Sequence, residues 1–243
     1  MIEIMNLSKS FKAVNAVNNI SFNVNQGEIV GLLGENGAGK TTTLRMLATM
    51  LKATGGTAKL NGFDINSEPE KVRGQIGILF GGEVGLYDRL TARENIEYFA
   101  ELNGMGKADI DRSMEYLIKN LEMEEYIDRR VGKFSRGMKQ KVAIARSIVH
   151  EPSVMLFDEP TAGLDVTASK IVQEFILKCK EQNKAIIFSS HSMQEVEKLC
   201  DRIVMIHRGM IIEQGTVEEL KEKYHIEDME EIFMRLAGDN NGK

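Results

Sequence analysis

A glycine-rich segment follows a short apolar run near the N-terminus. Gly34–Thr41 reads G-E-N-G-A-G-K-T and fits the pattern G-x-x-x-x-G-K-[ST], with an apolar strand pattern before it and a helical pattern after it. Backbone N–H groups in such a loop, together with the N-terminal end of the following helix, surround phosphate groups. The segment therefore predicts ATP binding through residues Gly34, Glu35, Asn36, Gly37, Ala38, Gly39, Lys40, Thr41 and Thr42.

Two carboxylates, Asp158 and Glu159, come directly after the apolar run Val154–Phe157. Mg²⁺ that is bound to phosphates prefers oxygen ligands and keeps several waters. We expect Thr41 and Asp158 to hold Mg²⁺, and Lys40 to reach the β- and γ-phosphates. Glu159 is then placed to deprotonate the water that attacks the γ-phosphorus. Alternatively, Asp158 and Glu159 are two solvated acids at a strand end without a role in catalysis. The presence of the phosphate loop in the same chain favours the catalytic interpretation.

The elements that must position these residues alternate between strand and helix patterns, which predicts an α/β fold. The apolar runs that end at Gly34, Asp158 and Ser189 are typical of strands covered on both faces in a parallel sheet. Strands are predicted at Ile2–Met5, Ile20–Val24, Glu28–Leu33, Ala58–Leu60, Gly77–Phe80, Val154–Phe157, Ala185–Ser189, Ile203–Ile206 and Met210–Glu213. Helices are predicted at Lys40–Leu51, Ala92–Leu102, Lys107–Leu121, Arg136–Val149, Thr167–Lys180 and Met193–Leu199.

The middle of the chain differs from both ends. Residues from about 84 to 150 have a helical pattern without a good strand, so two strand-bearing blocks flank a helical insert. After Gly215 the charged stretch Thr216–Lys243 carries a periodic apolar pattern. This pattern predicts one or two short helices that pack on the body of the protein or contact a second subunit.

Composition excludes several classes of protein. The net charge of −5 opposes sequence-independent binding of nucleic acid, which needs a strongly basic surface. The two cysteines, Cys179 and Cys200, lack metal-ligand spacing and are expected to be buried thiols. No apolar run approaches the length of about 20 residues that spans a bilayer. We therefore expect a cytoplasmic chain whose membrane association comes through a partner.

Three further motifs carry a resemblance to a known family. Phe134–Gln140 reads F-S-R-G-M-K-Q and resembles the signature sequence of ATP-binding cassette (ABC) ATPases. Ala162–Asp165 resembles their D-loop, and Ser189–His191 resembles the end of the strand that carries their switch histidine. The order and spacing of all five motifs match this family over essentially the whole chain.

The resemblance implies a fold and a division of the chain. The fold is a P-loop NTPase (RecA-like) core with an antiparallel β subdomain and a helical signature subdomain. Residues 1–225 would form the ATPase domain, with the helical subdomain at about 84–150, and residues 226–243 a short C-terminal helical tail.

The resemblance also implies roles for individual residues. Two cassettes of this family dimerise head to tail around two ATP molecules, so Ser135 and Gly137 would contact the γ-phosphate held by the other subunit. His191 would contact the γ-phosphate of its own subunit, and Asp165 would carry signals across the dimer. Phe11 stands where the family has an aromatic residue that stacks on adenine; an ordinary core aromatic is the alternative.

The chain departs from the family in two places. The glutamine that usually follows the Gly77–Phe80 strand is missing, and the sequence there reads G-G-E-V at residues 81–84. The signature has Arg136 where glycine is usual and Met138 where glutamine is usual, while the phosphate-facing Ser135 and Gly137 are retained.

Within the family the chain most resembles ATPase subunits of bacterial drug and ion exporters, and residues 79–91 look like the sodium-extrusion type. The expected partners are ATP, a second copy of the chain and an integral membrane permease at the inner face of the membrane, with no nucleic acid. A soluble ATPase of DNA repair or translation is the alternative, but the long coiled coil and the paired cassettes of those types are absent. A nucleotide-gated module that barely hydrolyses stays open because of the missing glutamine.

Overall fold

The computed structural model describes residues 1–12, 14–80 and 85–239, and its core is a six-stranded sheet. The strands lie in the order β10-β9-β3-β8-β7-β6, and all neighbours are parallel except β9 and β10. Their bounds are Ile29–Leu33 (β3), Ile76–Leu79 (β6), Val154–Asp158 (β7), Ala185–Ser190 (β8), Arg202–His207 (β9) and Met210–Gly215 (β10). The parallel core predicted from the apolar runs is confirmed.

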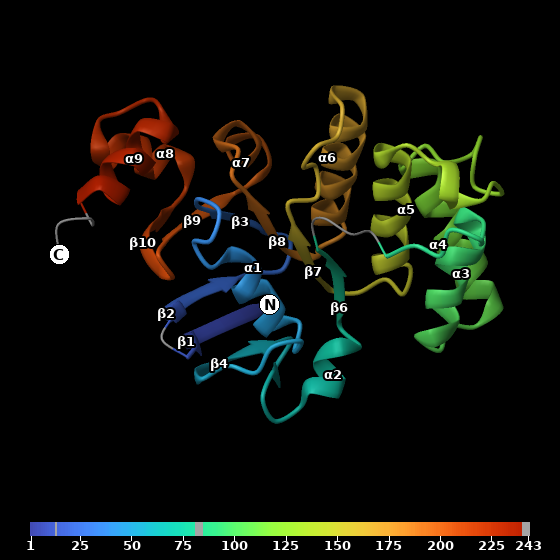
Figure 1. Cartoon of the computed structure of the whole chain (residues 1–243), viewed down its shortest axis with the longest axis horizontal. Coiled ribbons are helices and arrows are strands. Elements are labelled where there is room, and N and C mark those ends of the chain that lie inside the picture. Colours follow the sequence, from blue (N-terminus) through green and yellow to red (C-terminus); the bar gives the residue numbers. More distant parts are fainter. Residues whose placement is uncertain (13, 81–84, 240–243) are drawn as a thin grey trace.

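A second, antiparallel sheet lies below the first in Figure 1, in the order β2-β1-β4-β5. Its strands are Ile2–Phe11 (β1), Val14–Val24 (β2), Gly55–Leu60 (β4) and Phe63–Asp64 (β5). Both β1 and β2 are longer than the sequence predicted. Asn6 and Asn19 have φ of 50° and 54°, and the register between the strands shifts beside them. Such bulges interrupt the alternation by which a strand is recognised.

Six helices match their predicted ranges to within one residue at each end, except that α1 ends at Leu47 and not at Leu51. They are Lys40–Leu47 (α1), Ala92–Leu102 (α3), Lys107–Asn120 (α4), Arg136–Ile148 (α5), Val166–Glu181 (α6) and Met193–Leu199 (α7). A short helix at Pro69–Arg73 (α2) and a 3-10 turn at Val131–Lys133 (η1) were not predicted. The C-terminal stretch forms two helices, Val217–Tyr224 (α8) and Met229–Asp239 (α9), that pack against β10 as expected.

The six-stranded sheet separates two hydrophobic cores. Along β3, Ile29 and Leu33 pack into the core that holds α5, α6 and α7, whereas Val30 and Leu32 pack into the core between α1 and the antiparallel sheet. The same alternation runs through β7, β8 and β9. Because side chains alternate across a strand, a strand buried on both faces must be apolar at nearly every position.

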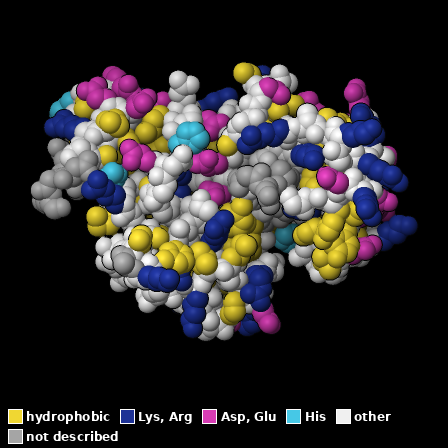
Figure 2. Space-filling view, viewed as in Figure 1, with side chains coloured by type: hydrophobic (Ala, Val, Ile, Leu, Met, Phe, Trp, Pro, Cys, Tyr) yellow, Lys and Arg dark blue, Asp and Glu magenta, His cyan; other side chains and the backbone are white. Residues whose placement is uncertain are grey.

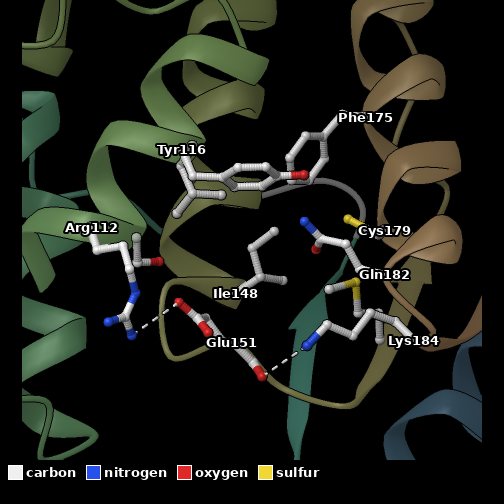
Figure 3. A pocket seen from close by; sticks show the side chains of 11 residues that line it. Arg112, Tyr116, Ile148, Glu151, Phe175, Cys179, Gln182 and Lys184 are labelled. Carbon is white, nitrogen blue, oxygen red and sulfur yellow. Dashed lines mark hydrogen bonds and ion pairs between the residues drawn. The ribbon is translucent and has the colours of Figure 1, made fainter. Parts of the chain in front are cut away.

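The helical insert joins the sheet at a junction of α4, α5 and α6. A hollow of about 320 Å³ lies there, and Figure 3 shows Tyr116 of α4 beside Phe175 of α6, with ring centroids 6.4 Å apart. Arg112 and Lys184 both turn toward Glu151, which precedes β7. These contacts hold the insert against the edge of the sheet opposite the phosphate loop.

Replacing Phe175 with alanine tests this junction, because its side chain is fully buried between the insert and the sheet. We expect Phe175→Ala to lower the free energy of unfolding by about 3–5 kcal/mol, since it removes buried apolar area and leaves a cavity. Met234→Ala on the exposed face of α9 is the control and is expected to change it by less than about 0.5 kcal/mol. Chemical denaturation measures both, and equal effects would contradict the packing described.

Candidate functional site

The phosphate loop lies between β3 and α1, at the carboxyl end of the parallel strands. Gly37 and Gly39 have φ of 83° and 114°, a conformation that favours glycine. A β-carbon on Gly34 would lie 2.3 Å from the carbonyl oxygen of Ile206, so this position also excludes any larger residue. Residues 35–42 line a hollow together with Glu159, which joins the loop to the acidic pair as the sequence predicted.

The ammonium group of Lys40 is buried inside this loop. Its Nζ donates hydrogen bonds to the carbonyl oxygens of Gly34 (2.6 Å) and Glu35 (3.1 Å), and lies 3.8 Å from Oε1 of Glu159. Burial lowers the pKa of Lys40, and the nearby carboxylates of Glu159 and Asp158 oppose that shift only in part. Because the two carboxylates offset only part of the cost of burying the Lys40 ammonium group, the site favours binding of an anion.

Asp158 is held by hydroxyl groups on both of its oxygens. Thr41 Oγ1 donates to Oδ2 at 2.7 Å, and Ser189 Oγ donates to Oδ1 at 2.5 Å. The parallel register pairs Asp158 with Ser189 across β7 and β8, which is why these side chains meet. The structure thus brings together Thr41 and Asp158, the pair predicted as Mg²⁺ ligands. Their hydroxyl and carboxylate oxygens are donors that suit this ion.

Glu159 has a left-handed backbone conformation with φ of 49°, at the step from β7 into the following loop. Its N–H donates to the carbonyl oxygen and the Oγ of Ser189, at 3.1 Å each. Its carboxylate oxygen Oε1 lies 3.3 Å from Nδ1 of His191, so the structure brings these two predicted residues together as well. A strained backbone at this residue is consistent with a functional constraint.

No role was predicted for the side chain of Ser189, although this residue begins the Ser189–His191 motif. It is fully buried and contacts both members of the acidic pair through one hydroxyl group. The signal in the sequence was a polar residue at the end of an otherwise apolar strand. The sequence does not show that β8 lies beside β7, so the contact of Ser189 with the acidic pair could not be predicted from this residue.

Among the described residues, Ser135 and Gly137 do not line the phosphate-loop hollow of their own chain. Ser135 caps α5, where its Oγ accepts from the N–H of Met138, and Gly137 lies in the first turn. Helix α5 packs against α6, and the two cores place α6 and α1 on opposite faces of the six-stranded sheet. Asp165 caps α6 in the same way, accepting from the N–H of Ala168 at 2.8 Å.

Phe11 and the place of the missing glutamine are the other two positions that the resemblance predicts. Phe11 ends β1, where its ring is 45% exposed and lies 4.9 Å from Nζ of Lys9, so it is not a core aromatic. The neighbouring β2 reaches the phosphate loop, because a β-carbon on Gly39 would lie 2.6 Å from the carbonyl oxygen of Ala16. The place of the missing glutamine, residues 81–84, falls outside the described residues.

Comparisons with known proteins agree with this geometry. The sequence pattern of the family described as "ABC transporter" matches residues 17–162. The chain is 50% identical over 238 residues to the "ABC transporter ATP-binding protein NatA" of Bacillus subtilis (strain 168), covering 96% of this chain and 97% of that protein. It is 36% identical to the "Bacitracin transport ATP-binding protein BcrA" of Bacillus licheniformis, covering 92% and 72%.

Solved structures show the same likeness. The ATP-binding subunit of an ABC transporter superposes with a TM-score of 0.89 at 29% identity, covering 97% of this chain and 99% of that one. A dimeric ATP-binding cassette in a post-hydrolysis state, bound to ADP and Pi, gives 0.81 at 26% identity, covering 89% and 98%. The chain belongs to the ABC transporter ATP-binding family, and it is an ATPase subunit with the P-loop NTPase fold that the sequence predicted. Within the described residues, no helix is long and apolar enough to cross a bilayer.

Ser189→Ala tests whether the hydrogen bonds to Asp158 and Glu159 matter for turnover. We expect kcat for ATP hydrolysis to fall by about tenfold or more, because partners of metal-binding side chains have effects of this size. Ser190→Ala is the matched control, since that hydroxyl donates to Glu195 rather than to Asp158. Steady-state phosphate release at varied Mg²⁺ measures both variants. Equal losses would show that Ser189 has no special part in the site.

Proposed function

We propose that this chain hydrolyses Mg-ATP in a head-to-tail dimer of two copies and thereby drives export through a separate membrane subunit. The observation that supports this most is the position of the Glu159 carboxylate. One oxygen lies within 3.8 Å of the phosphate-binding cation Lys40 and 3.3 Å from the imidazole of His191. A base held between two groups that would contact the γ-phosphate is placed to activate the attacking water.

The roles of the residues follow from their chemistry. Lys40 and the N–H groups of residues 34–42 stabilise negative charge on the phosphates, and His191 donates a hydrogen bond to the γ-phosphate. Glu159 accepts the proton of the attacking water. Thr41 and Asp158 would hold Mg²⁺, which would supply positive charge next to the phosphates. A nucleotide-gated module that barely hydrolyses is the second candidate, because the family's usual glutamine is replaced at residues 81–84.

A second copy completes the site in this proposal. Among the described residues, neither Ser135 nor Gly137 lines the phosphate-loop hollow of its own chain, so they would contact the nucleotide of the other copy. The dimeric cassette bound to ADP and Pi supports this arrangement. Asp165 and the exposed ring of Phe11 would contact the partner and the adenine, respectively. The net charge of −5 argues against a nucleic acid as partner.

An exposed aromatic surface on the helical insert is the proposed docking surface for the membrane subunit. It consists of the exposed Tyr87, Tyr98 and Leu102 with the half-buried Phe99, and Figure 2 shows hydrophobic side chains gathered over α3. Tyr98 packs edge-on against both Tyr87 and Phe99 with centroids 5.7 Å apart, and it remains 42% exposed. Exposed aromatic clusters of this kind mark protein interaction sites.

The cargo is proposed from resemblance alone. An ion such as sodium, or a drug, fits the likeness of residues 79–91 to exporter subunits and the names of relatives for bacitracin transport and doxorubicin resistance. The chain would then act in the cytoplasm, at the inner face of the membrane. Deleting the chain with its membrane subunit should raise the cellular level of the exported solute.

Glu159→Gln tests the catalytic role and the dimer together. We expect phosphate release to fall by about 100-fold or more while ATP binding persists, because the amide cannot accept the proton of water. ATP held without hydrolysis should shift the variant to a dimer in light scattering. Glu174→Gln, an exposed acid on α6, is the control and should leave turnover unchanged. Turnover by Glu159→Gln at the normal rate would remove Glu159 from catalysis.

Tyr98→Asp tests the docking surface. The carboxylate would put a charge at the centre of the aromatic cluster, so we expect the chain to retain its membrane subunit about tenfold less well. Phosphate release by the isolated chain should stay unchanged. Met210→Asp on β10, also an exposed hydrophobic side chain, is the control. Co-purification from detergent measures retention, and full retention by Tyr98→Asp would exclude this surface.

A further inference from the structure

The first turns of the signature helix α5 are attached to the segment that follows Glu159 in the same chain. Nε2 of Gln140 donates a hydrogen bond of 2.6 Å to the carbonyl oxygen of Pro160, and this contact is buried. Since Pro160 is the next residue after Glu159, the bond holds the main chain directly beside the proposed base. Leaving such a buried carbonyl without a donor would cost free energy.

Arg136 makes a second attachment, one turn earlier on α5. Its guanidinium lies against the backbone of Gly163, since a β-carbon built on Gly163 would come within 2.5 Å of both Cζ and a terminal nitrogen of Arg136. Gly163 has φ of 70°, so glycine suits this position in both conformation and space. The planar group therefore covers the middle of the D-loop.

Gly137 makes a third attachment on the same side of α5. A β-carbon there would lie 2.9 Å from Cβ of Ala168, in the first turn of α6, so the two helices approach closely at this residue. The contacts at Pro160, Gly163 and Ala168 follow one another along the chain, from the end of β7 through the D-loop into α6. A displacement of the start of α5 must therefore displace this whole segment or break the contacts.

We propose that Arg136 and Gln140 form a strut within one chain that transmits the position of the signature helix to Glu159 of that same chain. The inference rests on the proposed dimer, in which Ser135 and Gly137 contact the nucleotide of the other copy. The strut then links each bound nucleotide to the catalytic glutamate of the opposite site. Arg136 acts as a positioning residue through its packing on Gly163, not as a charge on the phosphate.

A dimer of two differently tagged copies separates these two roles of Arg136. One copy keeps Glu159, and the other carries Glu159→Gln, so only the site with the intact glutamate turns over. That site takes its signature from the Glu159→Gln copy. Arg136→Ala is first introduced into the copy with intact Glu159, where it breaks the strut to the base that is active. In a second dimer it is introduced into the Glu159→Gln copy, where it removes the charge next to the ATP that is hydrolysed.

The strut predicts that Arg136→Ala lowers the rate of phosphate release by about tenfold when it is in the copy with intact Glu159, because small displacements of a catalytic group have effects of this size. In the other copy it should change the rate by less than about twofold. Lys139→Ala, a neighbouring cation on α5 that lies 3.4 Å from Asp88, is the matched control in each placement. Arg136→Lys in the copy with intact Glu159 keeps the charge without the planar group and should also reduce the rate.

Several outcomes would overturn the strut. Arg136→Ala would contradict it by lowering the rate of phosphate release only when it is in the Glu159→Gln copy, equally in both placements, or in neither placement. A normal rate for Arg136→Lys in the copy with intact Glu159 would also contradict it. Unchanged melting temperatures of the Arg136 variants would show that folding is not the cause of a loss. If the mixed dimer without any Arg136 change releases no phosphate, the proposed function itself fails, and the strut fails with it.

Discussion

Ser189 and Thr41 donate hydrogen bonds to opposite oxygens of one carboxylate, that of Asp158. The three residues come from segments far apart in the sequence, and they meet because β3, β8 and β7 are parallel neighbours whose carboxyl ends reach the same edge of the sheet. The position of Glu159 depends on the same contact, since its N–H is bound to Ser189. A slip of one residue between β7 and β8 would remove both carboxylates from the phosphate loop.

The two cores on either side of the sheet maintain that register. Each strand places alternate side chains into the core around α1 and into the core around α5, α6 and α7, so a slip would exchange the two sets of residues. The packing of Phe175 against Tyr116 extends one of these cores into the helical insert. The signature helix is thus part of the same packed unit as the strand that carries the acidic pair, which is the physical basis for the strut.

The motifs of the site could be predicted because each is local: a loop needs its glycines, and a doubly covered strand needs a continuous apolar run. Contacts between distant segments could not be predicted where no motif marks the residues. Gln140 is an ordinary helical residue until α5 lies against Pro160, and Ser189 is an ordinary strand residue until β8 pairs with β7. Helix α1 ends at Leu47 rather than Leu51, because Thr49 turns the chain with φ of 58°.

In the proposed dimer, nucleotide, Mg²⁺ and a second copy would meet at the edge of the sheet where Thr41, Asp158 and Glu159 lie. A crystal structure of the chain with Mg²⁺ and a non-hydrolysable ATP analogue tests this most directly. We expect that Thr41 and Asp158 would hold Mg²⁺ and that the γ-phosphate would also contact Ser135 of a second copy. A nucleotide held by one chain alone, with Glu159 turned away from the γ-phosphate, would contradict it.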